Sequence, residues 1–96
     1  MSDRATASFV VASELGLHLR PAGLIVAAAA RFDSKIEVSG GDEWVDGSSI
    51  LSLVSLVASQ GTELQVRATG PDAAEAVAAL GKIIESEEVP SASTSP

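Results

Sequence analysis

The chain has 96 residues, of which 46% are hydrophobic, only 3% are aromatic and none is cysteine, and its formal net charge is −7. This length predicts one domain whose core is built from Val, Leu, Ile and Ala. The lack of cysteine excludes disulfides and thiolate metal sites, and six scattered Lys and Arg residues argue against nucleic acid or an anionic membrane as the partner. The start of the chain shows no signal peptide, so we expect a cytoplasmic protein.

In the first half of the chain apolar residues recur first every two residues, then about every 3.6 residues and then every two again, which predicts a strand, a helix and further strands. Residues 6–12 predict a strand. Pro21 suits the first turn of a helix, which we expect from Arg20 or Pro21 to about Arg31. Its apolar residues recur at spacings of three and four and predict a core-facing stripe of Pro21, Leu24, Ile25, Ala28 and Phe32. Residues 35–39 alternate as a strand, and after a glycine turn residues 43–46 return as its antiparallel partner.

The second half contains a short helix, a strand and a longer helix. Ser48 or Ser49 is expected to cap a helix from Ile50 to about Val57, which is apolar nearly all round. Residues 63–69 alternate as a strand. A helix is predicted from Ala73 to about Ser86, with a core stripe of Ala73, Val77, Leu80 and Ile84. We therefore expect a domain over residues 1–88 and a disordered tail rich in Ser and Pro over residues 89–96.

The predicted order is β-α-β-β-α-β-α. Four short strands that each have one polar face suit an antiparallel sheet with one face open to water. We predict an α+β fold, an open-faced sandwich whose four-stranded antiparallel sheet is covered on one face by three helices.

His18 is the single histidine of the chain and lies just before a predicted helix. A helix N-terminus offers free N–H groups and a positive dipole end, and Arg20 adds a guanidinium that can hold phosphate. Both disfavour a charged imidazolium, so the ring keeps a lone pair with which to accept a phosphoryl group. A histidine that merely caps the helix is the alternative. Neither a metal site nor a Ser-His-Asp hydrolase fits the surrounding residues.

The serines before the short helix have two interpretations. They can simply cap it, or one of them can be phosphorylated at the helix end. Phosphorylation would place negative charge beside Ile50, Leu51 and Val54. These residues are either core or a surface for a partner, and one sheet cannot cover the whole helix.

Two segments resemble the HPr phosphocarriers, the histidine-containing proteins of the phosphoenolpyruvate-dependent sugar phosphotransferase system. The first is Gly16-Leu17-His18-Leu19-Arg20-Pro21-Ala22, and the second is Asp46-Gly47-Ser48-Ser49-Ile50-Leu51 followed by Ser55-Leu56 and Gln60-Gly61-Thr62. The resemblance as a whole runs from about Ala5 to Ser86. The resemblance implies that the chain is not an enzyme and needs no cofactor. It implies that Enzyme I phosphorylates His18, that Arg20 binds the phosphate, and that the group passes to sugar-specific EIIA-type acceptors.

The resemblance also implies regulation and docking. Ser49 falls on the serine that an HPr kinase/phosphorylase modifies in many bacteria. The expected docking residues are Leu19, Gly23, Ile50, Leu51 and Val54. Ala27 and Ala30 stand where some relatives carry basic residues, which predicts slower association with Enzyme I. A carrier that visits several partners through one face is most simply a monomer.

Two other functions stay open. One is a regulatory protein of the same fold that acts by phosphorylation-dependent binding without sugar transport. The other is an acyl-carrier-like protein with phosphopantetheine on Ser49, which would require a helical bundle instead of strands.

Overall fold

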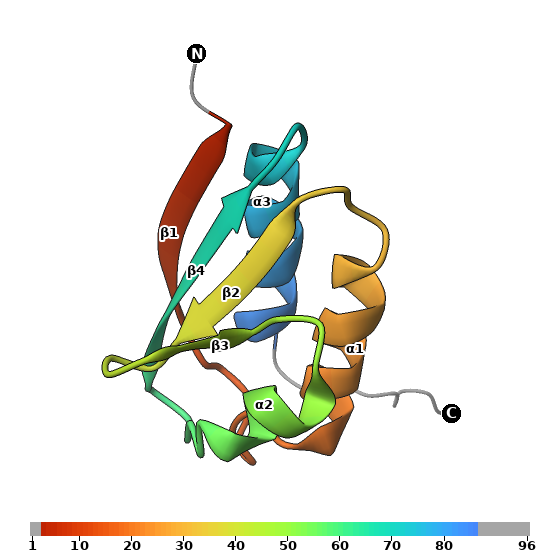
Figure 1. Cartoon of the computed structure of the whole chain (residues 1–96). Helices are drawn as coiled ribbons and strands as arrows, with labels where there is room; N and C mark the ends of the chain where they lie inside the picture. Colours follow the sequence, from red (N-terminus) through yellow and green to blue (C-terminus); the bar gives the residue numbers. More distant parts are fainter. Residues whose placement is uncertain (1–2, 87–96) are drawn as a thin grey trace.

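The computed structural model describes residues 3–86, in which three helices cover one face of a four-stranded sheet (Figure 1). The elements are β1 (Arg4–Val10), α1 (Leu19–Ala29), β2 (Lys35–Ser39), β3 (Trp44–Asp46), α2 (Ile50–Ser55), β4 (Glu63–Thr69) and α3 (Ala73–Ile84). The predicted order and the α+β open-faced sandwich are confirmed. The sheet also argues against the helical bundle of an acyl carrier. The tail expected over residues 89–96 lies outside the described residues.

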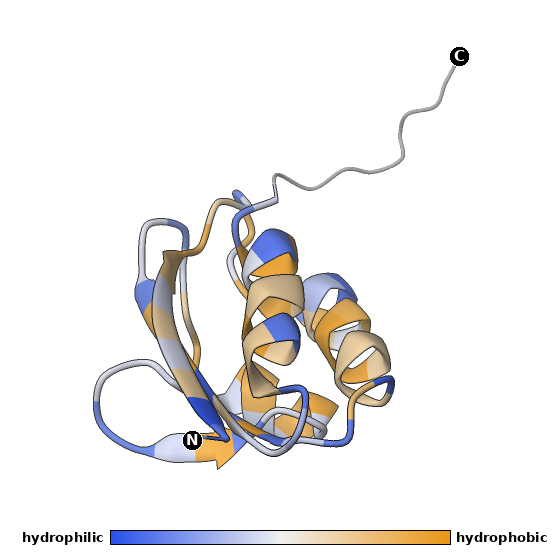
Figure 2. Cartoon of the chain, turned by 90° about the horizontal axis from the view of Figure 1, so that it is seen from above, coloured by the Kyte–Doolittle hydropathy of each residue, from blue (hydrophilic) through white to orange (hydrophobic). Residues whose placement is uncertain are grey.

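The sheet has the strand order β1-β4-β2-β3, and all neighbours are antiparallel. Along β4 buried and solvent-facing residues alternate, because successive side chains point to opposite faces. Figure 2 shows α1 and α3 side by side on one face only. On the open face Arg67 stacks 4.0 Å from the centroid of the Trp44 ring, and its Nε donates to Glu37 Oε1 at 2.8 Å. The open face is therefore polar, as predicted.

The core lies between the sheet and the helices and is aliphatic. Its largest fully buried side chains are Ile25, Leu53, Leu64, Leu80, Val38 and Val66. The stripe predicted for α3 is buried in full. The ring of Phe9 packs onto Gly81 of α3, where a side chain would overlap it.

The core face of α1 differs from the prediction. The buried residues are Pro21, Ala22, Ile25 and Ala29, whereas Leu24 is more than half exposed. Periodicity identifies an apolar stripe but not its edge, and α1 turns Ala22 and Ala29 toward the core, where α3 packs close beside it. The prediction for Leu24 is wrong.

Several of the predicted boundaries shift by one or two residues; for example, α1 ends at Ala29 and α3 ends at Ile84. β1 ends at Val10 because Ala12 turns away and donates its N–H to Ile84 O at 3.1 Å. α2 ends at Ser55 and not at Val57, which has a φ of 52°. α1 begins one residue earlier than expected, at Leu19. No helix in residues 3–86 is long and apolar enough to cross a membrane.

The connection between α1 and β2 is tied to the start of α3 by Asp72. Its carboxylate accepts hydrogen bonds from Ser34 Oγ at 2.7 Å and from Asp33 N at 2.9 Å. These bonds, the one from the Ser34 hydroxyl above all, hold the pKa of Asp72 below its ordinary value. α1 and α3 run antiparallel, so the start of α1 lies at the end of α3 (Figure 1). That end of the molecule holds His18.

Candidate functional site

His18 is the N-cap residue of α1. Its backbone is extended, its carbonyl accepts from Ala22 N at 3.1 Å, and its Nδ1 accepts from Arg20 N at 3.4 Å. His18 is half-buried, and the hydrogen bond to its Nδ1 holds the ring in one orientation. The capping role and the chemical role considered for this histidine are therefore compatible.

The loop before His18 is fastened to the α2–β4 loop. Leu17 N donates to Ala58 O at 2.8 Å, and Gly61 N donates to Val11 O at 2.8 Å. Gly16 has a φ of 75°, and a Cβ there would overlap Ala58 O and lie 2.9 Å from Ser59 Cα. Only glycine meets both requirements. The loop that carries His18 is thus held in place by the α2–β4 loop, which is distant from it in the sequence.

The hydrogen bond to Nδ1 defines the chemistry of the ring. Because Nδ1 accepts from the Arg20 N–H, the neutral imidazole has its lone pair on Nδ1 and its proton on Nε2. Nδ1 therefore faces the N–H groups and the positive dipole end of α1. An anion that reacts with this nitrogen meets hydrogen-bond donors at once.

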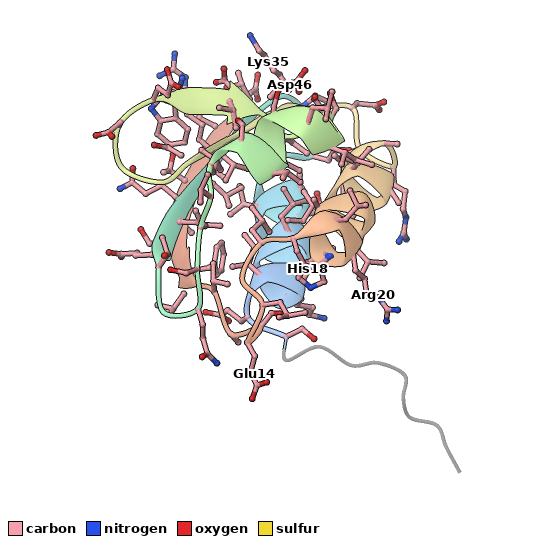
Figure 3. All side chains as sticks on the ribbon, turned by 90° about the horizontal axis from the view of Figure 1, so that it is seen from below. Glu14, His18, Arg20, Lys35 and Asp46 are labelled. Carbon is pink, nitrogen blue, oxygen red and sulfur yellow. The ribbon has the colours of Figure 1, made fainter. Side chains whose placement is uncertain are left out.

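The Arg20 side chain is exposed and extends outward from the start of α1 (Figure 3). Within residues 3–86 no hydrogen bond or ion pair engages its guanidinium. The structure thus brings Arg20 beside His18 through the backbone, while its charged group is available to a ligand. The same described residues contain no cluster of three His, Asp or Glu side chains that could hold a metal ion.

The expected docking residues differ in exposure. Leu19 is 66% exposed, Leu51 82% and Ile50 36%. Gly23 is half-buried, and a Cβ there would touch nothing within 4 Å. Val54 packs against the core and presents less surface than expected. α2 lies next to the start of α1, so Leu51 and Leu19 belong to the same end of the molecule (Figure 1).

Two exposed apolar residues at this end were not predicted. Leu15 is 76% exposed in the loop before His18, and Val57 is 83% exposed just after α2. Alternation and periodicity do not identify such loop residues. The exposure of Val57 is not predicted because no glycine or proline marks the end of α2 in the sequence.

Ser49, and not Ser48, caps α2. Its Oγ accepts from Ser52 N at 3.2 Å. Ser48 Oγ instead donates to Asp46 Oδ1 at 2.6 Å, and with the Ser48 N–H and Lys35 it holds the pKa of Asp46 below its ordinary value. Asp46 and Lys35 line a groove of about 430 Å³ at an edge away from His18 (Figure 3). The two serines therefore serve different local structures.

Comparison with known proteins gives one consistent result. A family model described as the PTS HPr component phosphorylation site matches residues 5–86. Phosphocarrier protein HPr of Treponema pallidum is 38% identical over 77 residues, which are 80% of this chain and 88% of that protein. The crystal structure of the phosphocarrier protein HPr from Bacillus anthracis superposes with a TM-score of 0.80 at 31% identity and covers 84% of this chain and 96% of its own.

A segment of a much longer protein is also similar. The multiphosphoryl transfer protein of Vibrio cholerae is 39% identical over 82 residues, which are 82% of this chain but 20% of that protein.

Proposed function

The chain belongs to the HPr family of phosphocarriers of the phosphotransferase system, and we propose that His18 carries its phosphoryl group. It is a phosphocarrier and not itself an enzyme. The observation that carries the proposal for His18 is the acceptance of the Arg20 N–H by Nδ1, which directs a nucleophilic lone pair toward the mouth of α1.

The transfer step follows from this geometry. Nδ1 attacks the phosphorus of the phosphorylated donor, a P–N bond forms at His18, and the bond between phosphorus and the donor breaks. Nδ1 then has no lone pair left, so the Arg20 N–H exchanges the ring nitrogen for a phosphoryl oxygen as its acceptor. The same hydrogen-bond donor thus orients the ring before transfer and stabilises the phosphoryl group after it.

Arg20 contributes a second set of donors. Its exposed guanidinium can rotate over the phosphoryl group and bind two of its oxygens. This role requires motion of a solvent-exposed side chain only, which is fast compared with turnover.

HPr proteins interact with phosphotransferases of their system. We infer that Enzyme I is the donor here and that EIIA-type proteins are the acceptors. A carrier whose phosphoryl group originates in phosphoenolpyruvate works where that metabolite is made, in the cytoplasm. One exposed face around His18 supports a monomer that meets these partners in turn.

We also propose that an HPr kinase/phosphorylase modifies Ser49. Ser49 is half-buried and its Oγ accepts from Ser52 N, so the kinase must draw the hydroxyl out of its cap. The phosphate would then stand beside Ile50 and Leu51 and oppose the docking of an apolar partner surface. This regulation leaves the fold intact, because phosphate oxygens can accept the same N–H groups.

The test of the carrier function is phosphorylation in solution. The protein is incubated with phosphoenolpyruvate and Enzyme I, and we expect one phosphoryl group that is labile in acid and stable in alkali. Mass spectrometry of the intact chain and its peptides should locate this group on His18.

The matched variant is His18→Asn. Asparagine is a good N-cap, so α1 is expected to keep its start while the nucleophile is lost. Phosphate incorporation that persists in His18→Asn would refute the assignment.

A further inference from the structure

Val57 adopts a backbone conformation that valine avoids. Its φ of 52° lies in the left-handed region, where a β-branched residue is an outlier. It follows Leu56, the C-cap of α2, and its N–H donates to Val54 O at 3.0 Å. Helices commonly place glycine at this position because glycine has no Cβ to clash. Valine therefore weakens the fold here.

Burial does not compensate for this conformation. The Val57 side chain is 83% exposed, so it gains little from the hydrophobic core. A strained and exposed apolar residue that no contact inside the monomer stabilises points to a contact with a partner.

The position of Val57 connects it to the phosphoryl-transfer site. The next residue, Ala58, accepts the N–H of Leu17 at 2.8 Å, and Leu17 directly precedes His18. Leu15 lies on the same loop as Leu17, beside Gly16, which packs against Ala58 and Ser59. We define the apolar rim as four exposed residues of this end of the molecule, namely Leu15, Leu19, Leu51 and Val57.

We propose that Val57 is a specificity-determining contact residue, which docks into an uncharged apolar surface of the phosphotransferase that exchanges the phosphoryl group with His18. The inference rests on the proposed function, because direct transfer to Nδ1 requires the partner to cover the residues around the imidazole. The hydrogen bond from Leu17 N to Ala58 O joins the residue before His18 to the residue after Val57, so Val57 lies close to that surface. Its four apolar side chains require a partner whose matching surface is apolar.

Substitutions at Val57 separate strain from contact. Val57→Gly and Val57→Asn both suit the left-handed conformation and remove the apolar side chain. We expect each to raise the Tm by a few degrees. In steady-state assays of phosphoryl transfer from Enzyme I, we expect the KM for this protein to rise about tenfold with kcat unchanged, which corresponds to about 1.4 kcal/mol of lost contact.

Val10→Asn is the matched control. Val10 is also an exposed valine, but its side chain lies on the open face of the sheet, and its substitution should leave the KM unchanged. Val57 variants with a higher Tm and an unchanged KM would overturn the proposal, as would a lower Tm for Val57→Gly. Failure of the proposed function appears differently, as a wild-type chain that takes up no phosphate. In that case, calorimetric binding of Enzyme I to wild type and Val57→Asn still decides the contact.

Discussion

In the proposed function, His18 combines a structural and a chemical role in one side chain. As the N-cap of α1 it accepts the Arg20 N–H through Nδ1, and the same bond sets the tautomer that can attack phosphorus. A residue that caps a helix is usually replaced at small cost by serine or asparagine. In the proposed function only histidine would supply both a cap and a transferable phosphoramidate, so the position would have no equivalent substitute.

Ser49 invites a test at the scale of the residue. Ser49→Ala removes the cap of α2, and we expect a loss of about 1 kcal/mol in the free energy of unfolding. Ser49→Asp restores a capping oxygen and the stability, but its charge beside Leu51 should slow transfer from Enzyme I. Thermal unfolding and transfer assays measure the two effects.

Ser48→Ala serves as the control for Ser49. The Ser48 hydroxyl donates to Asp46 and caps no helix. We therefore expect Ser48→Ala to change the rate of transfer from Enzyme I less than Ser49→Asp does. Equal transfer rates for Ser49→Ala and Ser49→Asp would contradict a regulatory role of charge at this position.

At the scale of elements, the packing of α3 on β1 depends on Gly81. A Cβ at this position would overlap the Phe9 ring and lie 2.7 Å from Cδ1. Alanine improves the helix propensity by up to about 1 kcal/mol, while overpacking a core costs about 1–3 kcal/mol. The cost of overlapping the Phe9 ring is therefore expected to exceed the gain in helix propensity.

Gly81→Ala is therefore expected to lower the Tm by several degrees. Gly23→Ala is the matched control, because this glycine is also helical but a Cβ there meets nothing within 4 Å. We expect Gly23→Ala to raise the Tm through the same propensity term. Calorimetry of both variants checks the pair, and a more stable Gly81→Ala would mean that the Phe9 ring moves aside at little cost.

The sequence predicts the long elements better than the short ones. α3 and β4 have strong periods, so their buried faces follow from pattern alone. In α2 the apolar run continues past the true end, because Leu56 and Val57 belong to the pattern but not to the helix. Only contacts with the loop before His18 show where the helix stops.

At the scale of the whole molecule, Asp72 holds two distant elements together, because its carboxylate joins the α1–β2 connection to the start of α3. The lowered pKa of Asp72 means that the charged carboxylate stabilises the folded state. This contribution is present above the ordinary aspartate pKa of about 4 and is lost as the pH falls through the lower folded value. Acid should therefore loosen the contact between these elements.

Asp72→Asn is expected to unfold at lower denaturant concentration than wild type at pH 7. The difference should stay constant down to about pH 5 and shrink below about pH 4, because wild type then loses the same charge. Urea titrations at several pH values measure it. Ser34→Ala removes the main donor and should reduce the pH-dependent part of the difference, whereas a difference independent of pH would refute the account.

The sequence alone determines the element order and the placement of His18 and Ser49 at helix starts. These features depend on local causes, namely periodicity, the fixed φ of Pro21 and the preferences of capping residues. Only the tertiary structure decides that Leu24 faces solvent, that Arg20 extends outward and that Val57 is strained and exposed. Each of these depends on how segments distant in the chain pack, as Val57 does on the segment that the hydrogen bond from Leu17 N to Ala58 O holds in place.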